Sequence, residues 1–243
     1  MAATAVPGFN PKERGFQFAN RFPSVPVMSL TIPWVGQVAL GNAANGLCGG
    51  MALAAADYFH RGVPLPGDRE PPAAGSALFR YIAARLVDSF DLPGGPLRYM
   101  EWMALPDLDQ GTLLGIASRT RQEWPGIRTK LDAGQLVPIA LIRAHSTAIG
   151  DLGKNHQVLA YGYDLDENTQ LLTVKLYDPN HPGEDVQLRC SLAPGGDLKL
   201  EYWTGEPTRG FFATPYVVVD PRPATAPISA WAKVGAWIRA HLP

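Results

Sequence analysis

The stretch NGLCGGMALAAADYF, residues 45–59, decides the fold that we predict for this chain of 243 residues. It opens on an Asn-Gly turn signal, and the residues after Cys48 are apolar or small almost all round. A helix without a polar face belongs in the interior of a protein. The pattern therefore predicts a buried central helix that begins at Cys48 and ends near Gly62, with Pro64 just beyond it.

The place of Cys48 in the first turn of that helix has a chemical consequence. Free backbone N–H groups and the positive end of the helix dipole favour a thiolate over a thiol. Because the thiolate is the nucleophile, we predict that Cys48 is catalytic. The alternative is an inert buried thiol, which is a common role of an unpaired cysteine.

The composition is typical of a globular protein and excludes several classes of partner. Apolar residues make up 46% of the sequence and charged residues 18%, as in ordinary folded domains. A net charge of −1 provides no extended basic surface for nucleic acid. The sequence shows no signal peptide and no run long enough for a membrane span. We therefore expect a cytoplasmic protein, an effector, or a domain cut from a larger protein.

The two cysteines, Cys48 and Cys190, are too few for a disulfide framework, and we expect both to be free thiols. Neither has the spacing of a zinc site, and the chain has no phosphate-binding loop and no dinucleotide fingerprint. We therefore expect no cofactor and no metal. The Asp-rich run 164–168 is expected to form a hairpin turn, because Asp and Asn favour turns.

Three parts are expected along the chain. Residues 1–44 contain repeated prolines and little helical period, which predicts an extended N-terminal arm. Within it, the alternating aromatic stretch 16–22 is either a short edge strand or part of the arm laid over the body. Residues 45–220 are expected to form the main domain. Residues 221–243 are expected to be a linker and an amphipathic C-terminal helix, which either docks on the body, the outcome that we favour, or contacts a partner.

The main domain divides into a helical half, 45–135, and a sheet half, 136–220. Besides the central helix, apolar spacing predicts helices at 76–90, 97–105, 109–120 and 124–134. Strand-length apolar runs separated by turn residues lie at 136–143, 156–164, 170–178, 185–191, 198–203 and 210–219. Helices followed by antiparallel strands predict an α+β fold.

A cysteine nucleophile needs a general base, and His156 is the histidine best placed to act as one. It opens a strand, and that strand and the next are equal in length around a turn centred near Glu167. A hairpin of this kind pairs His156 with Asp178. An acid at this place fixes the imidazole tautomer and stabilises the imidazolium. Asn180 is the alternative orienting residue.

These local settings resemble the papain-like cysteine peptidases. The segment GLCGGM, 46–51, resembles the start of their Cys-bearing helix, and NHQVLAYGYD, 155–164, resembles their His strand. The segment KLDAGQLVPIALI, 130–142, resembles the bacterial papain-like and bacteriocin-leader-processing peptidases. The phrase YDPNHPGED, 177–185, is similar to the segment around the acid of YopT-like effector peptidases. The resemblance covers roughly residues 40–220, although the papain segment Cys-Gly-Ser-Cys-Trp is absent.

The resemblance implies a papain-like fold, in which the nucleophilic Cys starts a central helix and the His and an Asn or Asp lie on a following antiparallel sheet. It also implies an oxyanion-hole glutamine about six residues before the cysteine, where this chain has Asn42. Gln37 and Asn45 are the other candidates for this amide donor. The second donor is expected to be the backbone N–H of Cys48.

The expected function is a thiol hydrolase, most simply a cysteine peptidase that acts on a protein or peptide through an acyl-enzyme. One alternative keeps the same triad for acyl transfer, deamidation or transglutamination. Another is a papain-like binding module without catalysis. A Cys48 sulfur within hydrogen-bond reach of a His156 ring nitrogen would favour an enzyme over the binding module.

Overall fold

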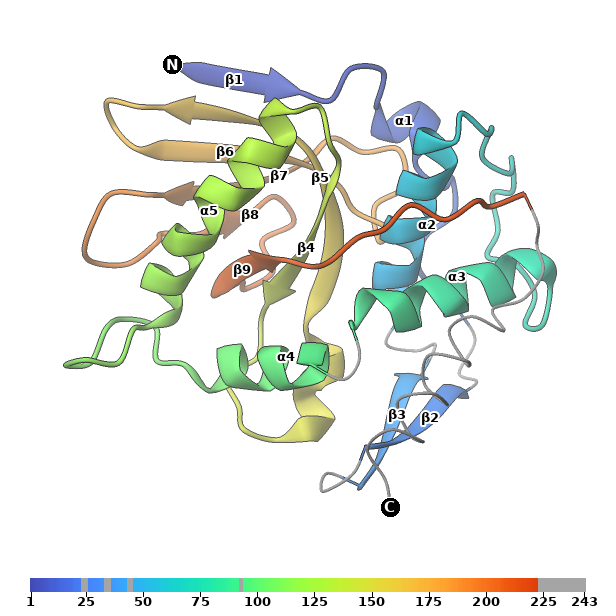
Figure 1. The fold of residues 1–243 in the computed structure, drawn as a ribbon, viewed down its shortest axis with the longest axis horizontal. Coiled ribbons are helices and arrows are strands. Elements are labelled where there is room, and N and C mark those ends of the chain that lie inside the picture. The colour runs from blue at the N-terminus through green and yellow to red at the C-terminus, as the bar shows by residue number, and fades with distance from the viewer. Residues whose placement is uncertain (23–25, 33–35, 43–45, 92–93, 223–243) are drawn as a thin grey trace.

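The structure is a computed structural model that describes residues 1–22, 26–32, 36–42, 46–91 and 94–222, with only the main-chain path given for 26–32 and 36–42 (Figure 1). It is a mixed α+β fold, as predicted. The helices are α1 (Pro11–Arg14), α2 (Cys48–His60), α3 (Ala77–Ser89), α4 (Gly94–Ala104), α5 (Ile116–Asp132) and the 3-10 helix η2 (Ile149–Lys154). The strands are β1 (Ala2–Ala5), β2 (Pro26–Ile32), β3 (Gly36–Asn42), β4 (Val137–Ile142), β5 (His156–Asp166), β6 (Leu171–Tyr177), β7 (Val186–Ser191), β8 (Glu201–Tyr202) and β9 (Gly210–Ala213).

The main sheet is antiparallel and has the strand order β8-β7-β6-β5-β4-β9. Strand β5 changes partner along one edge, because its first half pairs with β4 and its second half pairs with β1. The change occurs at a bulge between Ala160 and Gly162. A Cβ atom at Gly162 would lie 2.6 Å from the Thr4 carbonyl oxygen, so glycine permits the close approach of β1.

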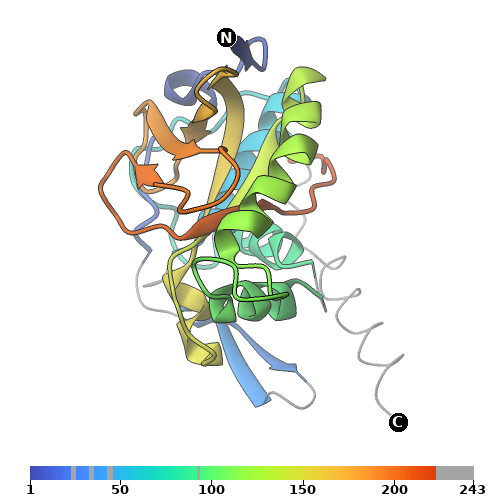
Figure 2. The same cartoon turned by 90° about the vertical axis from the view of Figure 1, so that its left-hand side faces the viewer.

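A separate two-stranded hairpin, formed by β2 and β3, lies apart from the main sheet in both views (Figures 1 and 2). Residues 1–44, which we expected as an extended arm, thus include β1 in the main sheet, the short helix α1 and this hairpin. The stretch 16–22 forms no strand, and its aromatic residues Phe16, Phe18 and Phe22 are buried against the body. Residues 223–243, and the predicted C-terminal helix with them, lie outside the described residues.

The predicted central helix is α2, and it is buried from Cys48 to Tyr58 between α3 and the sheet. Its C-terminal end is a Schellman motif. Gly62 adopts a φ of 62°, its N–H donates to the Phe59 carbonyl, and the N–H of Val63 donates to the Tyr58 carbonyl. The helix therefore begins and ends where the sequence predicted.

Two glycines after Cys48 let α2 pack closely against its neighbours. A Cβ atom at Gly50 would lie 2.1 Å from the Ile82 carbonyl oxygen of α3 and 2.9 Å from the Leu86 nitrogen. Both atoms belong to the backbone, so a methyl group here forces the two helices apart. A Cβ atom at Gly49 would meet the side chains of Gln157 and Ser89, each at 2.4 Å.

We expect Gly50→Ala to lower the free energy of unfolding by about 1–3 kcal/mol, the usual cost of an overpacked core. Gly126 is the matched control, because it is exposed on α5 and a Cβ atom there would meet nothing within 4 Å. Gly126→Ala is expected to raise stability by about 0.5–1 kcal/mol, because alanine is the better helix former. Urea denaturation of both variants checks the pair, and equal effects would contradict this account of the α2–α3 contact.

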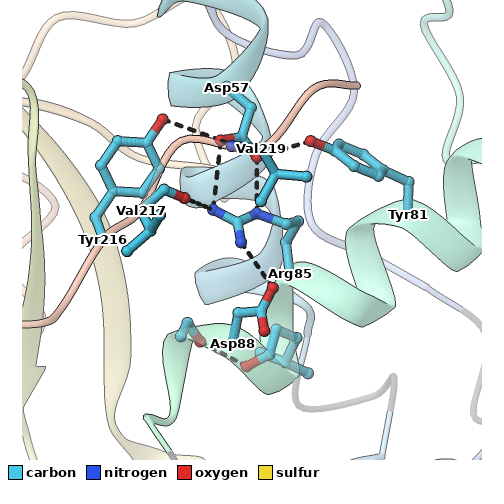
Figure 3. Close-up of polar contacts among 9 residues, drawn as sticks. Asp57, Tyr81, Arg85, Asp88, Tyr216, Val217 and Val219 are labelled. Carbon is cyan, nitrogen blue, oxygen red and sulfur yellow. Dashed lines mark hydrogen bonds and ion pairs between the residues drawn. The ribbon is translucent and has the colours of Figure 1, made fainter. Parts of the chain in front are cut away.

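The far end of α2 from Cys48 is held by a buried ion pair (Figure 3). Arg85 of α3 places Nε 2.7 Å from Oδ2 of Asp57, and both side chains are almost fully buried. Asp57 also accepts hydrogen bonds from the hydroxyls of Tyr81 and Tyr216, at 2.7 and 3.0 Å, and from the Val219 N–H at 2.9 Å. The ion pair and these hydrogen bonds thereby hold residues 216–219 against α2 and α3.

The same arginine makes two further contacts. Its Nη1 lies 2.7 Å from Oδ2 of Asp88, and its Nη2 donates to the carbonyl of Val217 at 2.9 Å (Figure 3). Burial raises the pKa of Asp57, while the charge of Arg85 and the three donors to its carboxyl oppose this rise. Arg85 and the three hydrogen-bond donors thus stabilise the charge of Asp57 in the interior.

Several of the element boundaries that we predicted from the sequence were wrong. The expected helices 109–120 and 124–134 are one helix, α5, which runs through Pro125. Residues 109–115 form a turn in which Asp109 Oδ1 accepts from the Gly115 N–H at 2.7 Å. The last two predicted strands, 198–203 and 210–219, shorten to β8 and β9.

No helix in the described part of the chain is long and apolar enough to cross a membrane. Among the same residues, no group of three or more His, Cys, Asp or Glu side chains could hold a metal ion. Both Cys48 and Cys190 are free thiols.

Candidate active site

Cys48 is the first residue of α2 and lies against the start of β5. Its side chain accepts hydrogen bonds from the His156 side chain and from the Gln157 backbone N–H. The residue is 9% exposed, so the thiol is largely sheltered from solvent. Its place follows from the local sequence, because the small residues Gly49 and Gly50 bring the first turn of α2 close to β5 and α3.

His156 connects Cys48 to Asp178. Its Nε2 lies 2.7 Å from Oδ1 of Asp178, and both side chains are buried. Because Nε2 faces the carboxylate, Nδ1 is the ring nitrogen left for the sulfur of Cys48. The structure therefore brings together the three side chains that the sequence singled out as a triad.

The hairpin register that led to this pair was wrong in detail. The last paired residues at this end are Leu159 and Tyr177, so by extension Asp178 falls opposite Val158 and not opposite His156. Side chains two residues apart in a strand point to the same face. His156 and Asp178 are therefore diagonal neighbours on one face of the sheet, which is still within reach of both side chains.

Two features of the hairpin explain the shift. Asp166 pairs with Leu171, so the turn is centred between Asn168 and Thr169 and not near Glu167. This later turn moves the partner of every β5 residue further along the chain. The bulge between Ala160 and Gly162 reverses part of that displacement. Neither the turn centre nor the bulge carries a clear sequence signal.

Asp178 is held in its ionised form by three donors. Besides the His156 ring, the Tyr202 hydroxyl donates to its Oδ2, and the backbone N–H of Asn180 donates to its Oδ1 at 2.8 Å. Burial opposes ionisation, but the charge of His156 and these hydrogen bonds lower the pKa of Asp178 to about 2. Asn180, the alternative orienting residue, thus supports Asp178 through its backbone.

The charges of the triad stabilise one another. Burial alone would raise the pKa of Cys48, but the charge and the hydrogen bond of His156, and the Gln157 N–H, bring it below the ordinary value of 9.0. Burial likewise disfavours the imidazolium, but the charges of Asp178 and Cys48 raise the pKa of His156 to about 10. Both shifts favour a thiolate paired with an imidazolium over a neutral thiol beside a neutral imidazole.

The second cysteine provides the contrast. Cys190 lies in β7 and is 2% exposed. Burial raises its pKa to about 12. The chain therefore contains one thiol whose surroundings favour the thiolate and one whose surroundings suppress it.

Asn20 is a residue of the site that sequence reasoning missed. Its Oδ1 accepts from the Leu47 N–H at 2.5 Å, and its Nδ2 donates to Oδ1 of Asn180 at 3.0 Å. Its own N–H donates to the Pro179 carbonyl at 2.9 Å. Asn20 thus links the loop before Cys48 to the loop after Asp178. An asparagine in an irregular segment gives no periodic signal by which this link could be found.

Tyr99 of α4 is a second residue without a sequence signal. It is buried, and its pKa is raised first by that burial and then by the charge of Cys48. Tyr99 therefore belongs to the buried surroundings that feel the charge of the thiolate.

Two of the predicted amide donors of an oxyanion hole, Asn42 and Gln37, belong to the separate hairpin. Asn42 ends β3, where its main chain pairs with Pro26, and Gln37 pairs with Thr31 near the start of the same strand. Their side chains and the whole of Asn45 lie outside the described residues. The placement of this donor therefore stays a prediction.

The arrangement has the parts needed for nucleophilic attack by sulfur: a thiolate at a helix start, a buried imidazole on it, and a buried carboxylate on the imidazole. The described residues around it offer no metal site. Comparison with known proteins finds no protein-family model, no curated protein and no solved structure that matches this chain.

Proposed function

We propose that the protein is a thiol hydrolase of papain-like fold, most simply a cysteine peptidase, with Cys48, His156 and Asp178 as its triad. The observation that carries this proposal is the continuous hydrogen-bonded chain from the Cys48 sulfur through the His156 ring to the Asp178 carboxylate. A binding module that had lost its chemistry would have no reason to keep a buried thiolate–imidazolium pair. Charges in an interior are costly unless a function or a partner retains them.

In the proposed reaction the Cys48 thiolate attacks the carbonyl carbon of a peptide or protein substrate, and a C–S bond forms. The negative charge moves to the carbonyl oxygen, where the Cys48 backbone N–H and an amide of Asn42, Gln37 or Asn45 stabilise it. The tetrahedral intermediate collapses, and the imidazolium of His156 gives its proton to the leaving amine. Loss of the amine, by cleavage of the C–N bond, leaves a thioester. Neutral His156 then accepts a proton from water as the water oxygen bonds to the acyl carbon, and cleavage of the C–S bond releases the carboxylic acid and restores the thiolate beside the imidazolium.

Asp178 acts on the base and not on the substrate. Its hydrogen bond to Nε2 fixes the ring so that Nδ1 faces the sulfur, and its charge stabilises the imidazolium. Tyr202 and the Asn180 N–H hold the carboxylate in turn. The acid is therefore anchored at two points besides the histidine.

Competitive labelling with iodoacetamide at pH 7, followed by peptide mapping, tests this proposal. We expect Cys48 to react at least about 100-fold faster than Cys190, because only the thiolate is alkylated. Labelling should abolish hydrolysis of a peptide library, as should Cys48→Ala, whereas Cys190→Ala is the matched control that keeps it. Equal reactivity of the two thiols, or unchanged hydrolysis after Cys48→Ala, would overturn the proposal.

A further inference from the structure

A pocket of about 330 Å³ opens beside the triad, with His156 in its wall. Gly46, two residues before the nucleophile, lines it, and so do Asn20 and Asn180 of the link between the two site loops. The pocket thus lies against His156 and against the loop that leads into Cys48.

The charges that line this pocket are unequal. Three of its side chains are cationic, Arg21, Arg143 and Lys154, and one is a carboxylate, Glu206. The chain as a whole carries a net charge of only −1, so this is a local concentration of positive charge and not part of a general excess. Low-dielectric walls around such a concavity concentrate its field.

The cations differ in how far they are neutralised. Arg143 pairs with Glu206 at 2.9 Å, and Lys154 pairs with Asp151 at 2.5 Å while remaining 66% exposed. Arg21 is exposed, and within the described part of the chain no carboxylate pairs with it. Glu206 already places a carboxylate on this wall, which shows that such a group can be accommodated there. Arg21 is left to receive a second one, and Lys154, which already shares its charge with Asp151, lines the same pocket.

We propose that this pocket binds an acidic side chain of the substrate, so that the enzyme prefers an Asp or Glu residue next to the bond that it cleaves. The inference rests on the function proposed above for the same site. Arg21 and Lys154 attract the carboxylate, and the hydrogen-bonded amide groups of Asn20 and Asn180 add polar surface to the same pocket. Arginine and lysine bind carboxylates through charge-assisted hydrogen bonds, and a neutral isostere loses that component.

The first test measures the charge preference of the site without any turnover. In a Cys190→Ala background, the Cys48 thiolate attacks the sulfenyl sulfur of a methanethiosulfonate, an S–S bond forms, and methanesulfinate leaves. We compare the anionic sulfonatoethyl reagent with the cationic trimethylammonioethyl reagent, each rate divided by that reagent's rate with a small free thiol. The anionic reagent should be favoured about 10-fold at low ionic strength, and salt at about 0.5 M should remove most of this preference.

Substitutions locate the preference in the pocket. Arg21→Gln should lower the anionic preference about 3-fold, because one charge of the wall is removed. Arg69→Gln, at an exposed arginine that does not line the pocket, is the matched control and should leave the preference unchanged. A preference near one in the parent protein, or equal effects of the two substitutions, would overturn the inference.

The second test uses a fluorogenic peptide library in which each position in turn is fixed as Asp, Asn, Glu, Gln or Lys. We expect one position at which the acidic residues raise kcat/KM about 10-fold over their amides, and at which Arg21→Gln reduces the advantage. Cleavage with no acidic preference would overturn this inference and leave the proposed hydrolase intact. A preference for the anionic reagent without cleavage of any peptide would support the binding of an acidic group in this pocket and count against the proposed peptidase activity.

Discussion

Replacement of His156 by alanine is expected to slow alkylation of Cys48 at pH 7 about 100-fold. Without the imidazolium, burial and the charge of Asp178 raise the pKa of the thiol and only the Gln157 N–H lowers it. Because burial is the largest of these effects, the pKa rises to the ordinary 9.0 or above. A thiol with a pKa of 9.0 is only about 1% thiolate at pH 7. Hydrolysis should fall further, by about 10²–10⁴-fold, because the proton donor to the leaving amine is also lost.

The pH profile separates this effect from damage to the fold. In the parent protein, the thiolate–imidazolium pair exists over a range of pH. The range begins at the lowered pKa of Cys48 and ends near pH 10, where His156 loses its proton. Alkylation should therefore be nearly level across neutral pH, and hydrolysis should decline as the pH rises through about 10. In His156→Ala, alkylation should instead increase about tenfold per unit of pH through pH 9.

His145→Ala is the control for that experiment, because His145 is exposed in the loop before η2 and contacts no member of the triad. It should leave the level profile unchanged, and circular dichroism should show both variants folded. If His156→Ala alkylates at pH 7 within about 3-fold of the parent rate, His156 does not control the ionisation of Cys48.

Replacement of Arg85 by methionine is expected to lower the free energy of unfolding by about 3–5 kcal/mol. Removal of one partner of a buried ion pair leaves the other charge in the interior without compensation. Asp57 is fully buried, and the two tyrosine hydroxyls and the Val219 N–H that remain on it carry no charge. For a chain of this size the melting temperature should fall by about 10 °C.

A double substitution tests the reason given for this loss. Asp57→Leu together with Arg85→Met removes both charges, and we expect it to recover much of the stability lost in the single variant. The control is Lys12→Ala, which breaks the exposed pair with Asp185, whose side chains are each 59% exposed. Such a pair contributes at most about 1 kcal/mol. Urea denaturation measures all three, and a loss under about 1 kcal/mol in Arg85→Met would contradict the account.

The features that the sequence predicted well are those written in local pattern. The run after Cys48 is apolar on every side, and a helix of that kind is stable only in the interior. The sequence therefore predicted α2 together with both of its ends. The strand predicted at 136–143 is β4. An apolar run that is rich in branched residues and preceded by glycine is typical of a buried strand. The pair of His156 and Asp178 was found for a related reason, since a hairpin ties two strand ends together even when its register is two residues off.

The features that the sequence missed depend on contacts between distant segments. Pro125 lies inside α5, where propensity alone would end a helix, and the buried Trp124, Ile127 and Leu131 hold that helix on the body. Asn20 and Asp57 look like ordinary polar residues in the sequence. Their roles arise from partners that lie far from them along the chain, at Asn180 and Arg85.

The spread of these contacts along the chain also sets the order in which the protein can be completed during synthesis. Cys48 emerges from the ribosome long before His156 and Asp178, so the thiol spends that interval without its base. Strand β1 likewise waits for its partner residues in β5, and Asp57 waits for Tyr216 and Val219. Contacts between residues so far apart close late and slowly. The contacts of Cys48 with His156, and of His156 with Asp178, can therefore form only after residue 178 has been made.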